Sequence, residues 1–91
     1  MEIIWTQHAG ERQRRWEEKR GITRPEVERI LQDPEQVVPG RRNAQVAQSR
    51  RGHGLLRVPF VREGEKRVIL TVYWTSKVDK YWRGESNESD L

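Results

Sequence analysis

The 91-residue sequence contains no cysteine, only two histidines and no long apolar run. Without cysteine there is neither a disulfide nor a thiolate ligand or nucleophile, and two histidines give little support for a transition-metal site. No window approaches the roughly 18 apolar residues of a membrane span. A phosphate loop, a dinucleotide glycine pattern and a serine nucleophile elbow are also missing. These absences predict a soluble cytoplasmic protein with no membrane contact, metal or cofactor.

Acidic residues are missing from residues 36–62, a segment that holds six arginines: Arg41, Arg42, Arg50, Arg51, Arg57 and Arg62. The net charge of the whole chain is +4, and its acids include three in residues 84–91, where there is no base. The part before this tail is therefore more cationic than the whole chain. Such a block predicts RNA or DNA as the partner, bound in a salt-dependent way through counterion release. Charge that merely keeps a small domain soluble is the alternative.

The pattern of apolar and polar residues predicts one α+β domain over residues 1–83, followed by a disordered acidic tail over residues 84–91. A short strand is expected at residues 2–6 and a helix at residues 7–20, with Thr6 as its N-cap. A second helix is expected between Thr23, its N-cap, and Asp33, with Pro25 in the first turn and Glu26 at the capping-box position. The two N-terminal helices should form a helical hairpin on one face of a sheet.

From residue 36 onward the apolar period changes to two, which predicts strands at residues 36–38, 43–48, 55–62 and 67–75. The last of these is the expected central strand of a twisted, mostly antiparallel sheet of four to five strands. Its helix-covered face should be apolar and consist of Val68, Leu70, Val72 and Trp74. Its other face should be half-wet, suited to a polar ligand, and consist of Ile69, Thr71, Tyr73 and Thr75. Pro59 cannot donate a ladder hydrogen bond, so it implies a bulge or an unpaired stretch within residues 55–62.

One candidate site lies on the first helix, where His8, Arg12 and Arg15 stand at positions i, i+4 and i+7 and share a face. An imidazole can move protons near neutral pH, and an arginine can hold a phosphate through its bidentate fork. Metal-free RNA cleavage needs these groups. The alternative is a histidine that only caps or packs, with solvated arginines beyond it.

A second candidate site lies at the end of the predicted central strand, where Tyr73 and Thr75 share the half-wet face. Lys77 and Lys80 are expected to line its mouth, and Tyr81 to stack on a base or transfer a proton. The alternative is structural, with the aromatic rings as anchors and the lysine stems lying over them.

Several segments resemble an uncharacterised bacterial family of domains of unknown function: residues 6–12, 20–23, 26–31, 33–35 and 68–73. That family has a His-Ala-x-x-Arg helix, an Arg-Gly-Ile-Thr turn and a closing Val-x-Thr-x-Tyr strand, and it is related to the RelE/ParE toxin superfamily. These toxins are small basic proteins with two helices packed on an antiparallel sheet. RelE-like toxins cleave mRNA in the ribosome, and ParE-like ones inhibit gyrase. In this sequence His8 and Arg12 match the helix motif, and Thr71 and Tyr73 match the strand motif.

The resemblance and the residues together favour a toxin-like, metal-independent endoribonuclease of a toxin–antitoxin system. Its predicted catalytic residues are His8, Arg12, Lys77 and Tyr81. His8 would shuttle a proton, Arg12 and Arg57 would clamp the phosphate, and Lys77 or Tyr81 would assist the leaving group. The predicted nucleic-acid contacts are Arg15, Arg41, Arg42, Arg50, Arg51, Arg57 and Lys80. The implied partners are RNA, for example ribosome-bound mRNA, and an antitoxin. The alternatives are a non-catalytic nucleic-acid-binding module and a protein-interaction domain that binds an antitoxin or gyrase. The oligomeric state stays open.

Overall fold

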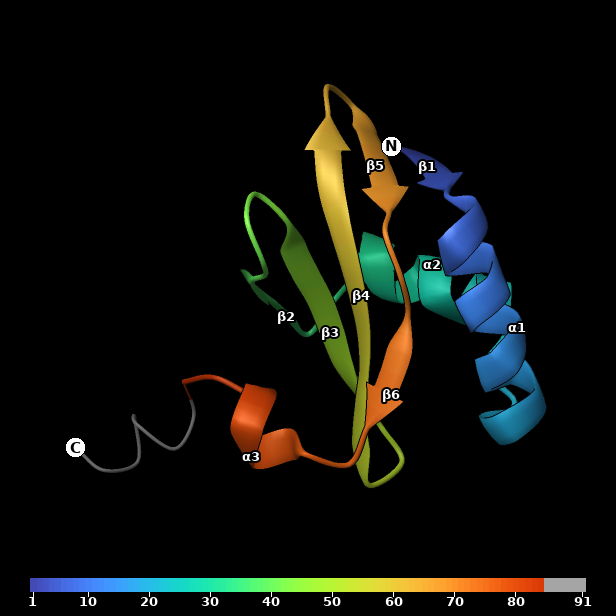
Figure 1. Ribbon diagram of the computed structural model, residues 1–91. Coiled ribbons are helices and arrows are strands. Elements are labelled where there is room, and N and C mark those ends of the chain that lie inside the picture. The colour runs from blue at the N-terminus through green and yellow to red at the C-terminus, as the bar shows by residue number, and fades with distance from the viewer. Residues whose placement is uncertain (85–91) are drawn as a thin grey trace.

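The computed structural model describes residues 1–84, so the predicted tail lies outside the described residues apart from Gly84. Figure 1 shows β4 running through the middle of the strands, with α1 and α3 on opposite sides of them in this view. The elements in chain order are β1 (Glu2–Trp5), α1 (Gln7–Arg20), α2 (Arg24–Gln32), β2 (Gln36–Pro39), β3 (Gln45–Arg51), β4 (Gly54–Glu63), β5 (Lys66–Ile69), β6 (Tyr73–Thr75) and α3 (Val78–Tyr81). No helix within the described residues is long and apolar enough to cross a membrane.

The predicted architecture is wrong in its layout. Strand β1 leads the chain ahead of the helices, so the chain does not begin with a helical hairpin packed on a sheet. Residues 1–84 hold six strands in one sheet, rather than four or five, and a third helix follows them. β1 pairs in parallel with β5, more than 60 residues later in the chain. Apolar periodicity reports the face of a strand and not its distant neighbour, which is why this pairing was not predicted.

Both long helices begin at the predicted caps. The Thr6 hydroxyl accepts a hydrogen bond from the Ala9 amide at 3.1 Å, and the Thr23 hydroxyl accepts one from the Glu26 amide at 3.3 Å. Such caps satisfy backbone donors that have no partner within the helix. Gly21 ends α1 with a φ of 70°, a left-handed conformation that glycine adopts without strain.

The sheet has the order β1-β5-β4-β3-β2, and β6 pairs with β4 as well. All pairs except β1 with β5 are antiparallel. The central strand is therefore β4. The prediction that residues 67–75 form the central strand is wrong. That segment is divided into β5 and β6, which pair with successive parts of β4.

The division between β5 and β6 is a bulge of one residue. Phe60 of β4 pairs with Ile69, and Arg57 of β4 pairs with Tyr73. Two residues of β4 thus face three residues, 70–72, of the neighbouring segment. An extra residue of this kind reverses the alternation of side chains beyond it. The face prediction for residues 67–75 is accordingly wrong in part, because Ile69 is buried in the core while Leu70 lies on the other face.

Pro59 lies opposite this bulge. Its carbonyl accepts a hydrogen bond from the Leu70 amide at 2.9 Å. In an antiparallel ladder the carbonyl and the N–H of one residue point to the same neighbouring strand. The N–H that proline lacks would therefore point at the bulge, where the ladder is already interrupted. β4 itself is continuous from Gly54 to Glu63, so the interruption lies in the neighbour of β4 and not within residues 55–62.

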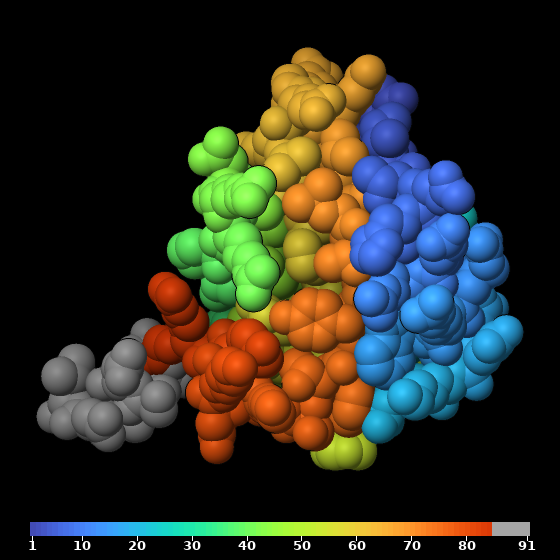
Figure 2. Space-filling view, viewed as in Figure 1, coloured from blue at the N-terminus to red at the C-terminus, as the bar shows by residue number. Residues whose placement is uncertain are grey.

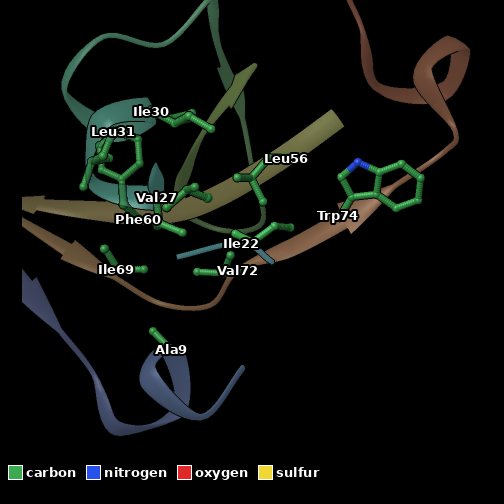
Figure 3. Packing of buried hydrophobic residues seen from close by; sticks show 12 residues of the cluster. Ala9, Ile22, Val27, Ile30, Leu31, Leu56, Phe60, Ile69, Val72 and Trp74 are labelled. Carbon is green, nitrogen blue, oxygen red and sulfur yellow. The ribbon is translucent and has the colours of Figure 1, made fainter. Parts of the chain in front are cut away.

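The hydrophobic core joins one face of the sheet to side chains from the helical segment. Leu56, Ile69 and Val72 from the sheet segments are fully buried, and they cluster with Ala9 of α1 and Val27 of α2. Figure 3 shows these side chains gathered between the ribbons. Since even-numbered residues of β4 face this core, the odd-numbered ones, including Arg57, face the opposite side of the sheet.

Candidate functional site

A groove of about 910 Å³ lies on the face of the sheet opposite the core. Its floor consists of side chains from β3, β4 and the bulge, and its walls consist of the β2–β3 loop and α3. Figure 2 looks onto this face, where the green β2–β3 region and the red α3 border the orange β6 segment. The lining contains five cationic side chains and no carboxylate: Arg41, Arg42, Arg57, Lys80 and Arg83. The groove is therefore a positively charged surface.

Arg57 lies in the floor of the groove and is only 6% exposed. Its Nε donates a hydrogen bond to the Gln48 Oε1 at 2.8 Å, and its Nη1 donates to the Tyr73 hydroxyl. The guanidinium carbon lies 3.9 Å from the centroid of the Tyr81 ring and 5.5 Å from that of Tyr73. Neutral groups thus hold the guanidinium in place on several sides.

No described carboxylate forms an ion pair with Arg57. Taking a charge out of water costs on the order of several kcal/mol unless an opposite charge compensates it. A guanidinium has five N–H donors, and the two hydrogen bonds to Gln48 and Tyr73 leave donors unused. Arg57 is therefore arranged to receive an anion, and a phosphate matches its planar fork.

Two tyrosines stand beside Arg57. The rings of Tyr73 and Tyr81 meet edge to face, with centroids 6.4 Å apart. Burial raises the pKa of Tyr73 above its usual value; Arg57 offsets part of this, and Tyr81 adds to it. Burial would also raise the pKa of Tyr81, but Lys80, the Tyr73 hydroxyl and Arg57 outweigh it and lower that pKa below 10.0. The Lys80 ammonium lies 5.2 Å from the centroid of the Tyr81 ring. Tyr81 is thus the more readily ionised of the two tyrosines, which is a property of a general base.

Two glutamines connect the floor of the groove to the wall that α3 forms. The Gln48 Nε2 donates hydrogen bonds to the Gln36 Oε1 at 2.8 Å and to the Tyr81 carbonyl at 3.0 Å. The Gln36 Oε1 also accepts a hydrogen bond from the Arg83 amide at 3.2 Å, and the Gln36 Nε2 donates one to the Arg83 carbonyl. Side-chain amides of β2 and β3 therefore hold the backbone of residues 81–83.

The opposite wall is the β2–β3 loop. The Gly40 amide donates to the Ala44 carbonyl, and the Ala44 amide donates to the Arg41 carbonyl, both at 2.9 Å. Within this turn Arg42 has a φ of 56°, a left-handed conformation that is uncommon for a residue with a side chain. Arg41 and Arg42 are exposed and line the groove. The loop thus adds two exposed charges to the groove whose lining also includes the buried Arg57.

The structure brings together only part of the predicted site. Arg41, Arg42, Arg57 and Lys80, which were predicted as nucleic-acid contacts, line the groove together with Tyr81, which was predicted as a catalytic residue. Their roles stay predictions. The other predicted residues do not line it: His8, Arg12, Arg15, Lys77, Arg50 and Arg51.

His8, Arg12 and Arg15 are exposed side chains of α1. Lys77 is exposed and lies before α3, where its amide donates to the Thr75 hydroxyl at 3.1 Å. The predicted catalytic group therefore does not come together in the groove, because Tyr81 lines it and His8, Arg12 and Lys77 do not.

Arg50 and Arg51 take different environments, because neighbouring residues of a strand face opposite sides. The Arg50 guanidinium lies 4.4 Å from the centroid of the Trp82 ring, and its amide donates to Glu35 at 2.6 Å. The Arg51 side chain forms an ion pair with Glu26 of α2 at 3.0 Å. Both residues thus contact other parts of the protein.

Sequence reasoning missed the site roles of Gln36, Gln48 and Arg83. It placed Tyr73 in the second candidate site but did not predict its hydrogen bond with Arg57. Period-two alternation through the predicted strands does place Gln48 on one face, but nothing in the sequence pairs it with residue 57 or residue 81. Within residues 1–84 no group of three or more His, Cys, Asp or Glu side chains is placed to hold a metal ion.

Comparison of the chain with protein-family models, with the curated proteins and with the solved structures finds no match in any of the three.

Proposed function

We propose that the groove binds single-stranded RNA and that the protein is a toxin-like, metal-independent endoribonuclease. The observation that carries the proposal is the buried Arg57 guanidinium, which has no described carboxylate partner and faces a groove lined by four further cations. A phosphodiester supplies the missing negative charge at Arg57. The neighbouring phosphates along the strand meet the two arginines of the β2–β3 loop and the two cations of the α3 wall.

The groove suits a single strand because the buried Arg57 and the half-buried Tyr73 lie in its floor, between the β2–β3 loop and α3. An extended backbone can enter such a space with its bases directed outward. The Tyr81 ring is already in contact with the Arg57 guanidinium, so the contacts are with phosphate rather than with a stacked base. Binding with little sequence preference follows, because phosphate contacts carry no base information.

The proposed reaction transfers the phosphate within the RNA. The 2′-hydroxyl oxygen attacks the adjacent phosphorus, and its proton passes to the phenolate oxygen of Tyr81. The bond from phosphorus to the 5′-oxygen breaks, and this oxygen takes a proton from the Lys80 ammonium. The products are a 2′,3′-cyclic phosphate and a 5′-hydroxyl, and proton return from Tyr81 to Lys80 restores the enzyme. Arg57 stabilises the charge that develops on the phosphate oxygens.

This proposal moves the centre of the predicted activity away from α1. Tyr81 takes the proton-transfer role that the sequence analysis assigned to His8. Lys80 takes the leaving-group role that it assigned to Lys77 or Tyr81. Supporting this change, the pKa of Tyr81 is lowered by the cations beside it. The ribosome-bound mRNA and the antitoxin implied by the resemblance stay predictions.

Cleavage of a labelled 20-nucleotide single-stranded RNA in the presence of a chelator tests the proposal, with the deoxy strand of the same sequence as the control. The RNA should be cut to products with a cyclic phosphate end, the DNA should stay intact, and the rate should rise with pH. Tyr81→Phe should lower the rate by about 100-fold or more, the usual contribution of a general base. His8→Ala should leave it unchanged. Loss of activity in His8→Ala but not in Tyr81→Phe would place the reaction outside the groove.

A non-catalytic RNA-binding module is the second candidate function. It is favoured by the composition of the groove lining, which among the described residues includes no imidazole and no carboxylate. Proton transfer then depends on tyrosine and lysine alone, whereas binding needs only the cations. Binding of the RNA without any cleavage by the wild-type protein would establish this second function, and absence of both would end the case for RNA.

A further inference from the structure

The amide of Gln48 occupies the junction between the floor and the α3 wall of the groove. The residue is fully buried in the middle of β3. Its oxygen accepts from Arg57, and its nitrogen donates both to Gln36 and to the backbone of Tyr81. One side chain thus contacts the anion-binding guanidinium and the segment that carries Tyr81.

Because the Gln48 side chain is neutral, it leaves the positive charge of Arg57 uncompensated. A glutamate has the same shape, but its carboxylate would form a buried ion pair with Arg57 and supply the negative charge that the ligand otherwise brings. It would also lack the N–H groups that Gln48 donates to Tyr81 and Gln36, and its oxygen would face the Tyr81 carbonyl instead. Glutamine therefore holds the guanidinium without neutralising it.

The α3 wall depends on these amides. α3 has only four residues, and none of them is buried. The hydrogen bonds from Gln48 and Gln36 reach the backbone at residues 81 and 83, and the stacking of Arg50 on Trp82 lies between them. A short element with no core side chain is held mainly by such contacts, so losing an amide should loosen it.

We propose that Gln48 is the positioning residue of the groove, with Gln36 behind it. By fixing Arg57 and the backbone of Tyr81 with one amide, it couples phosphate binding in the floor to the docking of residues 78–83 in the wall. The inference rests on the proposed function, because it takes an RNA phosphate as the ligand. Coupling of this kind is reciprocal: the docked wall strengthens phosphate binding, and bound phosphate strengthens docking.

The test compares Gln48→Glu with Gln45→Glu. Both substitutions replace glutamine by glutamate in β3 and change the net charge equally, but Gln45 pairs with Phe60 and does not line the groove. The probe is a fluorescein-labelled 12-nucleotide oligouridine followed by fluorescence anisotropy. Gln48→Glu should weaken binding at least tenfold, whereas Gln45→Glu should change it no more than about twofold, as expected for a solvent-screened charge outside the groove lining.

Hydrogen exchange and NMR provide readouts that do not depend on RNA. The Arg83 amide, which donates to Gln36, should exchange at least tenfold faster in Gln48→Glu and in Gln36→Met than in the wild-type protein. Titration of the wild-type protein with inorganic phosphate should shift the Nε–H resonance of Arg57 and slow the exchange of the Arg83 amide. Gln36→Met keeps Gln48 in place, so it serves if Gln48→Glu does not fold.

Oligouridine binding that is unchanged in Gln48→Glu, or an Arg83 amide equally protected in Gln36→Met, would overturn the inference. If the wild-type protein does not bind the oligouridine, the proposed function fails. The coupling is then decided by phosphate alone: an Arg83 amide that does not respond to phosphate rejects it, and one that slows supports it.

Discussion

The proposed binding of RNA in the groove should depend on salt, to an extent set by the number of cations that line the groove. Each phosphate that a cation neutralises on a single strand contributes roughly −0.7 to the slope of log K against log salt concentration. With five cations lining the groove, the expected slope is about −3.5 if each meets one phosphate. Between 50 and 200 mM salt, the affinity should then fall on the order of 100-fold. Fluorescence anisotropy with a labelled oligouridine at several salt concentrations measures this slope.

Removing two charges either from the groove or from α1 shows which cations contribute to the salt dependence of RNA binding. Replacing Arg41 and Arg42 together by alanine should reduce the slope to about −2.1, because two phosphate contacts are lost. Replacing Arg12 and Arg15 together removes the same charge from α1, outside the groove lining. That control should leave the slope near −3.5. Both pairs are exposed in the structure, so neither variant should affect folding.

The reverse pattern would refute the reasoning. A slope that responds to Arg12 and Arg15 but not to Arg41 and Arg42 would place the nucleic acid on α1, as the sequence alone suggested. A wild-type slope shallower than about −1.5 would mean that no more than two phosphates are contacted, too few for a strand lying along the groove.

Two further predictions concern stability. Arg42→Gly should raise the free energy of unfolding by about 1 kcal/mol, because glycine adopts the left-handed φ at this position without strain. Urea denaturation measures this gain and should show none for the control Arg41→Gly. Arg42→Gly should still bind RNA more weakly than the wild-type protein, because it lacks one cation of the groove. Tyr73 has a raised pKa, so the folded state favours its protonated form, and the stability this gives is present below pH 10 and lost as the pH rises through the folded-state pKa. Thermal unfolding should therefore show a steeper loss of stability above pH 10 in the wild-type protein than in Tyr73→Phe; equal slopes would contradict the burial of that hydroxyl.

The features that sequence reasoning predicted well are local. The N-caps at Thr6 and Thr23 are confirmed, because a cap depends on residues three positions apart. The strand expected at residues 55–62 is likewise present as β4, because its apolar pattern lies within its own residues. The sequence alone does not show which of the six arginines in residues 36–62 is buried, because burial of a side chain depends on the residues that cover it in the tertiary fold. The neighbours of Arg57 are Gln48, Tyr73 and Tyr81, which belong to β3, β6 and α3.

Features that depend on distant pairing were not predictable in this way. The contact of Gln48 with the Tyr81 backbone joins residues 33 positions apart, and the parallel pairing of β1 with β5 joins still more distant ones. His8 and Arg12 share a helix face as predicted, but helical spacing says nothing about whether that face borders a groove. A shared face was thus a sound local inference, whereas a shared active centre required the tertiary fold.

The bulge between β5 and β6 determines which side chains meet in the groove. Counted by strict alternation from the buried Ile69, Tyr73 would point into the core and Trp74 into the groove. The extra residue reverses this order, so that Trp74 is buried while Tyr73 meets Arg57. Pro59 lies opposite and lacks the N–H that a continuous ladder would require at this point. A backbone irregularity that can be suspected from one proline therefore decides whether a tyrosine hydroxyl reaches the buried guanidinium, and with it the chemistry of the groove.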